Sequence, residues 1–250
     1  MLKPLDGKVA VVTGAGKNIG RAIALKLARD GAGVVINGRS DQAALDAVVR
    51  EIEAEGGRAM TAIADVSDPE AVARMTDAAV ARLGGIDILI SNAGLRRQTA
   101  FLDMGLAEWR EILSVALDGA FILTRAAVPH MIRRGGGAIV ALSGISTHVG
   151  TPNRCHVSAS KAGLEGLMRA LAIELAPHGI TANTVAPGSV DTVRGAAAGV
   201  RPGTLGDSAI PLQRKASVDD IAAMVRHLAG PEGAYITGQT IHVNGGLYLT

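Results

Sequence analysis

The stretch VAVVTGAGKNIG, residues 9 to 20, decides the fold of this 250-residue chain. A short β-branched run, residues 9 to 12, leads into a glycine-rich turn, and helical spacing follows at Ile19, Ile23 and Leu27. Glycines let the backbone turn tightly and approach a pyrophosphate, which then binds the N–H groups at the start of the helix. For such a motif taken alone, an ordinary strand-to-helix turn is the alternative.

The rest of the chain repeats the alternation of strand and helix. Further short apolar runs lie at residues 33–36, 59–63, 86–90, 138–142, 180–185 and 240–243. Helical spacing lies between them, for example at Leu45, Val48 and Ile52. This order predicts right-handed crossovers and a parallel sheet covered on both faces. We expect a single-domain, doubly wound α/β fold of the Rossmann type over residues 1–250, with about seven strands.

Two segments break this rhythm. Residues 107–131 form a long, mostly helical pattern that carries Trp109, which we interpret as a core or interface residue. Residues 189–211 are rich in glycine and alanine and include Arg194 and Arg201. Loops of this length are usually functional or disordered, so the sequence predicts a mobile substrate loop here.

Composition excludes several classes of function. Hydrophobic residues make up 48% of the chain and charged residues 19%, which suits a compact globular protein. The net charge of +2 is too small to indicate binding to nucleic acid or to an anionic membrane, so we expect a small-molecule partner. The single cysteine, Cys155, forms no internal disulfide, and no apolar signal or spanning segment is apparent, so we expect a cytoplasmic protein. No metal site is predicted.

Several motifs in order resemble those of the short-chain dehydrogenase/reductase family. Residues 13–20 are similar to its T-G-x-x-x-G-x-G loop, and the segment 91–94, Ser-Asn-Ala-Gly, to its N-N-A-G. Residues 183–192 fit N-x-x-x-P-G-x-x-x-T, and the ending 236–246 also looks like the family's. Asn18 stands where the family usually has its middle glycine. Asn tolerates left-handed backbone better than most residues, so we expect the loop to survive.

The resemblance implies a dinucleotide-binding site and indicates which residues form it. They are Gly14, Gly16, Lys17, Asn18, Ile19, Gly20, Arg39, Asp65, Val66, Asn92, Ala93, Gly94, Lys161, Pro187, Gly188, Val190 and Thr192.

Cations near the second strand predict NADP(H) as the cofactor. Gly38 falls where a carboxylate would hold the ribose hydroxyls of NAD, and Arg39 follows it. Arg39 can bind the additional phosphate of NADP bidentately, and Lys17 adds a second charge. Two solvated surface cations are the alternative.

The catalytic positions implied by the resemblance are mostly lost. The family uses Tyr as acid/base, Lys to lower the pKa of that Tyr, Ser to bind the substrate oxygen, and Asn in a water relay. Lys161 matches the lysine, but Val157, Gly144 and Ala116 stand at the other three positions. Since a general acid contributes about 10²–10⁴-fold in rate, we expect ordinary carbonyl reduction to be crippled. Lys161 can still bind the nicotinamide ribose.

Nearby residues offer replacement proton donors. Ser143 and His156 each lie one place before a lost residue, keep the same separation, and are interpreted as a displaced catalytic pair. However, a helix turns His156 well away from Lys161, so a polar histidine at the pocket edge is the alternative. Ser146, His148 and Cys155 are weaker candidates.

Three functions stay open. The first is an NADP(H)-dependent oxidoreductase with a nonstandard proton donor; the second is a lyase or isomerase; the third is a noncatalytic NADP(H)-binding protein. Arg96 and Arg97, after the 91–94 segment, indicate an anionic substrate, or else are solvated loop arginines or subunit contacts. The resemblance and the apolar 107–131 helix together predict a homo-oligomer, most simply a homotetramer.

Overall fold

Seven parallel strands form a single sheet in the computed structural model, which describes residues 3–193 and 209–250. The strands are β1 (Val9–Val12), β2 (Gly33–Gly38), β3 (Arg58–Ile63), β4 (Ile88–Ser91), β5 (Gly137–Leu142), β6 (Ile180–Pro187) and β7 (Thr240–Val243). Their order is β3-β2-β1-β4-β5-β6-β7, and every neighbouring pair is parallel. The Rossmann-type fold and all seven strands predicted from the sequence are confirmed.

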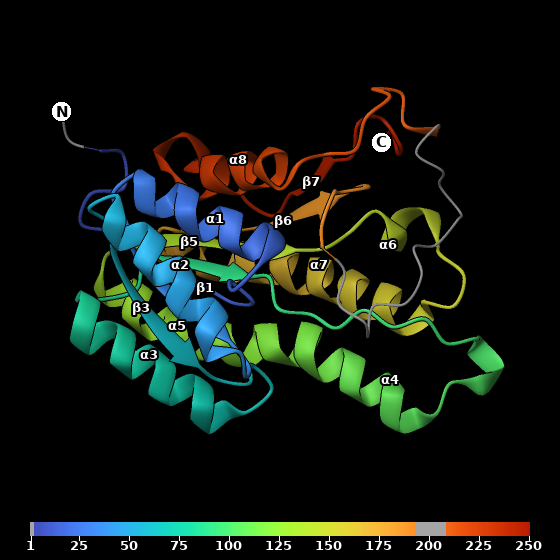
Figure 1. Ribbon diagram of the computed structural model, residues 1–250, viewed down its shortest axis with the longest axis horizontal. Coiled ribbons are helices and arrows are strands. Elements are labelled where there is room, and N and C mark those ends of the chain that lie inside the picture. Colours follow the sequence, from blue (N-terminus) through green and yellow to red (C-terminus); the bar gives the residue numbers. More distant parts are fainter. Residues whose placement is uncertain (1–2, 194–208) are drawn as a thin grey trace.

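Helices cover both faces of the sheet (Figure 1). They are α1 (Asn18–Arg29), α2 (Gln42–Ala54), α3 (Pro69–Leu83), α4 (Leu106–Leu113), α5 (Gly119–Arg133), α6 (Ser146–Val149), α7 (Cys155–Leu175) and α8 (Val218–Ala229). One core cluster joins the sheet to α1, α2 and α8, and a second joins it to α3, α5 and α7. The central strands are apolar throughout because both of their faces are buried.

The long helical pattern at 107–131 is a continuous helix, Leu106–Arg133. It comprises α4, a π-helical turn η2 (Ser114–Asp118) and α5. Its most apolar window has a mean hydropathy of 1.5, so by length and composition alone it could cross a membrane. Buried side chains of α5 belong to the core cluster that also contains α3 and α7. Core packing therefore accounts for part of this composition, since 39% of that window is buried.

A buried carboxylate fastens the amino ends of two central strands. Asp87, only 1% exposed, accepts a hydrogen bond from the backbone N–H of Val9 at 2.9 Å. It also pairs with Lys8 at 3.3 Å and with Arg134, just beyond α5, at 3.2 Å. Asp87 thus joins β1, β4 and the end of α5 at the edge of the sheet opposite the predicted site.

Candidate active site

The carboxyl ends of β1, β4, β5 and β6 meet where the strand order reverses, which is where ligands bind in open α/β sheets. Thr13 and Asn92 connect the first two of these ends. The Thr13 hydroxyl donates to the carbonyl of Ile90 at 3.1 Å and accepts from the N–H of Asn92 at 3.0 Å. The Asn92 side-chain amide donates to the Gly14 carbonyl at 3.1 Å. The glycine loop is therefore held rigidly against β4.

The glycine loop has a shape that side chains would destroy. Gly14 has a left-handed φ of +62°, and a Cβ on Gly20 would lie 2.3 Å from the Gly14 carbonyl oxygen. Lys17 is the N-cap residue of α1, its side chain makes no cap hydrogen bond, and the first turn contains no acidic residue. The first N–H groups of α1 are thus left for an anion, and this arrangement fits a dinucleotide pyrophosphate.

Asn18 adopts the left-handed backbone expected of it, with φ of +52°. Its side-chain amide also makes a reciprocal pair with the backbone of Val193, which follows β6. Asn18 Nδ2 donates to the Val193 carbonyl at 2.9 Å, and the Val193 N–H donates to Asn18 Oδ1 at 3.0 Å. The amide thus links the cofactor loop to the segment after β6.

The end of β2 is cationic. Arg39 and Lys17 are both exposed, and Gly38 at the end of the strand carries no side chain. Burial alone would raise the pKa of Asp65, but two hydrogen bonds from Ser67 and the nearby charge of Arg39 lower it overall. Arg39 and the ionised Asp65 are therefore close enough to interact, on the side of the loop where the sequence predicts the adenosine phosphate.

A cavity of about 220 Å³ opens beside the loop. Eight of the predicted cofactor residues line it: Ile19, Asn92, Gly94, Lys161, Pro187, Gly188, Val190 and Thr192. The Lys161 side chain is partly buried, and its ammonium donates to the carbonyl of Leu142. Burial, and then the charge of Arg96, lowers the pKa of Lys161 from 10.5 to about 8.

The predicted catalytic pair is not brought together. Ser143 lines the cavity next to Gly144, and its hydroxyl donates to the Glu165 carboxylate. His156 is completely buried, its Nε2 lies 3.2 Å from Glu108, and it is not among the described residues that line the cavity. The geometry therefore separates the two, and only Ser143 keeps a position from which it can reach a substrate.

Two of the three positions that lack the usual catalytic groups lie at the cavity. Val157 and Gly144 line the cavity, and Ala116 is buried in the π-helical turn η2. A Cβ on Gly144 would meet nothing nearer than the Ser146 hydroxyl, at 3.9 Å. Space alone would therefore accept a side chain at Gly144.

The side chains of the adjacent Arg96 and Arg97 lie in different surroundings. Arg96 lines the cavity, whereas Arg97 is bound to Glu111 of α4, with its Nη2 at 3.0 Å from the carboxylate. The second arginine of the cavity is Arg154, which the sequence reasoning missed. It precedes Val157 by three residues and α7 by one, so helical spacing could have placed it near the lost tyrosine.

The weaker catalytic candidates, Ser146, His148 and Cys155, lie in different surroundings. Ser146 lines the cavity, and His148 Nε2 lies 3.1 Å from Glu165. The Cys155 sulfur instead contacts the Met104 sulfur at 3.8 Å. Glu165, four residues after Lys161 and thus on the same face of α7, was missed from the sequence. Of the predicted loop at 189–211, residues 194–208, with Arg194 and Arg201, lie outside the described residues.

Comparison with known proteins identifies the family. A family model described as Enoyl-(Acyl carrier protein) reductase matches residues 14–248. The chain belongs to the short-chain dehydrogenase/reductase family.

Three known proteins are similar to this chain over nearly their whole length. A 3-oxoacyl-(acyl-carrier-protein) reductase of Staphylococcus aureus is 40% identical, covering 97% of this chain and 98% of its own. A short chain dehydrogenase from Burkholderia cenocepacia in complex with NADP is 37% identical with a TM-score of 0.88, covering 98% and 99%. A blue fluorescent protein from a metagenomic library in complex with NADPH is 36% identical with a TM-score of 0.92, covering 99% and 100%.

Proposed function

We propose that this member of the short-chain dehydrogenase/reductase family is an NADP(H)-dependent oxidoreductase. The observation that carries the proposal is the combination of the glycine loop, which contains the exposed Lys17, with the exposed Arg39 directly after β2, where Gly38 leaves no carboxylate. The similar structures that contain NADP and NADPH support it. When bound, the cofactor supplies a hydride that the protein does not possess.

The chain's own residues would hold this cofactor in three places. The α1 N–H groups and the rigid loop from Gly14 to Gly20 suit the pyrophosphate. Arg39 and Lys17 suit the 2′-phosphate, because arginine binds phosphate bidentately. Lys161 would donate from its ammonium to the nicotinamide ribose, in exchange for part of its contact with Leu142.

The substrate is proposed to be a small anionic carbonyl compound, such as a short 2-oxo or 3-oxo carboxylate, or the matching hydroxy acid. Arg96 and Arg154 both line the cavity with Lys161, and none of the described lining residues is acidic. A carboxylate in such surroundings gains charge-assisted hydrogen bonds. Arg97 does not support this proposal, because it faces Glu111.

The direct test follows cofactor fluorescence and absorbance in two steps. NADPH should bind at least tenfold more tightly than NADH, and NADPH absorbance should fall when oxo carboxylates are added but not when matched neutral ketones are. Equal affinity for NADH would refute the phosphate argument. Faster turnover of the neutral ketones would refute the anionic substrate.

A noncatalytic NADP(H)-binding role is the second candidate. It is favoured by Val157, Gly144 and Ala116, which leave three family catalytic positions without a functional group. Tight NADPH binding with no turnover of any carbonyl, imine or activated alkene would support it. Turnover with unchanged absorbance would instead support a lyase or isomerase.

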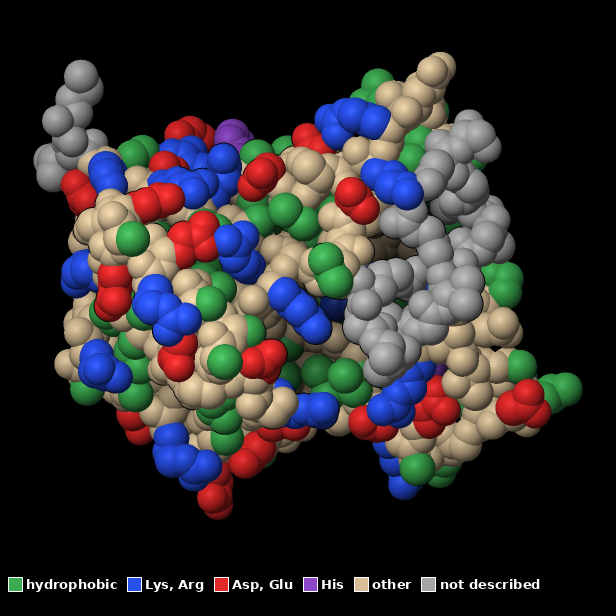
Figure 2. All heavy atoms as spheres, in the orientation of Figure 1, with side chains coloured by type: hydrophobic (Ala, Val, Ile, Leu, Met, Phe, Trp, Pro, Cys, Tyr) green, Lys and Arg blue, Asp and Glu red, His purple; other side chains and the backbone are tan. Residues whose placement is uncertain are grey.

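A homotetramer is proposed for the assembly. Large apolar side chains are exposed at and before α4 and on α5: Phe101 (74% exposed), Leu102 (94%), Leu106 (60%) and Phe121 (51%). Over the face shown in Figure 2, Lys and Arg side chains are interspersed with Asp and Glu. Light scattering should give four times the chain mass of 25.4 kDa, and a monomer at micromolar concentration would refute assembly. A cytoplasmic location stays a prediction.

A further inference from the structure

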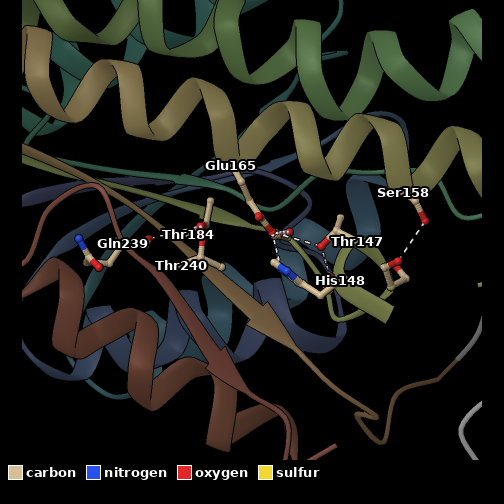
Figure 3. A network of polar contacts seen from close by, with 10 residues as sticks. Thr147, His148, Ser158, Glu165, Thr184, Gln239 and Thr240 are labelled. Atoms are coloured by element: carbon tan, nitrogen blue, oxygen red, sulfur yellow. Dashed lines mark hydrogen bonds and ion pairs between the residues drawn. The ribbon is translucent and has the colours of Figure 1, made fainter. Parts of the chain in front are cut away.

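A buried carboxylate joins the wall of the cavity to a histidine ring (Figure 3). Glu165 Oε1 accepts a short hydrogen bond from the Ser143 hydroxyl and lies 3.1 Å from His148 Nε2. The Thr147 hydroxyl is 3.3 Å from the same oxygen. The Glu165 side chain is only 7% exposed, so these contacts offset the cost of burying it. They also form a continuous series of hydrogen-bonding groups from the cavity wall to the His148 ring.

The two ends of this series differ in their surroundings. Ser143, directly after β5, lines the cavity. His148 on α6 is 19% exposed, and its ring packs against His242 and Tyr248 with centroids 4.5 and 5.1 Å away. Burial, and then the charge of His148, lowers the pKa of His242 despite the opposing charge of Glu165. His242 is therefore neutral, and it packs against the His148 ring, which contacts Glu165.

The usual proton donor is missing where this series ends. Val157 lines the cavity and has no proton to give. Lys161 lies one helical turn before Glu165, and its ammonium bonds the carbonyl of Leu142 and is placed for the cofactor. Ser143 differs from an ordinary hydroxyl in a cavity wall because its hydroxyl is hydrogen-bonded to the buried carboxylate of Glu165.

We propose that Ser143, Glu165 and His148 form the proton relay of this enzyme, with Ser143 as the catalytic residue and the other two as groups that act through it. This proposal rests on the proposed oxidoreductase function.

The relay is balanced in atoms and charge. While the carbonyl carbon gains a hydride, Ser143 gives its hydroxyl proton to the substrate oxygen and takes one from the carboxyl of Glu165. Glu165 has received that proton from the His148 imidazolium, which regains one from water. In the direction of alcohol oxidation each transfer reverses, and Glu165 accepts the proton, as its contact with the Ser143 hydroxyl already allows.

Kinetics of an oxo carboxylate in the parent and in variants test the relay. Glu165→Gln keeps the shape but cannot pass a proton, so kcat should fall at least 100-fold while KM and the NADPH dissociation constant change less than threefold. Ser143→Ala should lower kcat by as much. Ser143→Thr should keep most of the parent's kcat because threonine also has a hydroxyl. Ser158→Ala is the matched control, because that hydroxyl bonds the carbonyl of Ser146 and does not touch Glu165.

A second readout does not depend on turnover. In ¹⁵N NMR of the imidazole groups without cofactor, the His148 Nε2 signal should shift in Glu165→Gln and stay in place in Ser158→Ala. Unchanged kcat in Glu165→Gln, or an unmoved His148 signal, would overturn the relay alone. NADPH binding without turnover in the parent would instead refute the oxidoreductase proposal and the relay's catalytic use with it.

Discussion

Replacing Lys161 with methionine should stabilise the folded protein and weaken its hold on the cofactor. The lysine is partly buried at the cavity, and its charge is partly satisfied by the Leu142 carbonyl. Methionine has a similar length, fits apolar surroundings and carries no charge. The substitution therefore measures two effects separately: how much the Lys161 ammonium destabilises the fold, and how much it strengthens cofactor binding.

The pKa sets the size and sign of the effect. It falls from 10.5 to about 8 on folding, and at about 1.4 kcal/mol for each pKa unit the buried charge costs about 3 kcal/mol. Below pH 8 the lysine is charged in both the folded and the unfolded chain, and the whole cost is present. Between pH 8 and 10.5 the unfolded chain binds more protons, so the parent's free energy of unfolding rises with pH.

Urea unfolding of the apo protein at pH 7 and at pH 10 measures this. Lys161→Met should be about 3 kcal/mol more stable than the parent at pH 7, and the advantage should shrink at pH 10. NADPH affinity should fall about 10- to 100-fold, as expected for the loss of a charge-assisted hydrogen bond. Lys26→Met, on the half-buried side of α1, controls for removing any one lysine. A stability difference that stays constant with pH, or a less stable variant at pH 7, would refute the reasoning.

Three other substitutions test the remaining features. Arg39→Asp should reduce the preference for NADPH over NADH at least tenfold in fluorescence titrations, and an unchanged preference would remove Arg39 from the phosphate site. Asp87→Ala should lower the free energy of unfolding by about 3 kcal/mol, because it leaves the Val9 N–H and two cations without their acceptor; a loss below about 1 kcal/mol would contradict this. Gly144→Ser together with Val157→Tyr should raise reduction of simple ketones by about 100-fold, measured by NADPH absorbance. No gain would show that the missing side chains are not what limits the parent.

The sequence predicts the sheet and the cofactor loop well for physical reasons. Buried parallel strands require continuous apolar runs, and the close contact between Gly14 and Gly20 admits no side chain, so both features leave a local signal. Asn18 was correctly expected to take a left-handed conformation. Its bond with Val193 had no local signal, because 175 residues separate the two.

Spacing in the sequence does not predict the site residues correctly where consecutive side chains point in different directions. His156 and Val157 are consecutive on α7, but a step of one residue turns the helix by about 100°, so Val157 faces the cavity and His156 faces Glu108. Arg96 and Arg97, in the loop after β4, also have different surroundings: Arg96 lines the cavity and Arg97 contacts Glu111. Glu165 could not be found because its partners lie directly after β5 and on α6, 17 and more residues away along the chain.

Asn18 gives the cofactor loop a property that glycine could not supply. A glycine would adopt the same backbone more easily, but it would have no amide to match the two hydrogen-bonding groups of Val193. This position therefore combines a left-handed backbone with a contact to a distant part of the chain. A displacement of the glycine loop would pull on the chain that leaves β6, so the two ends of the candidate site are expected to move together rather than separately.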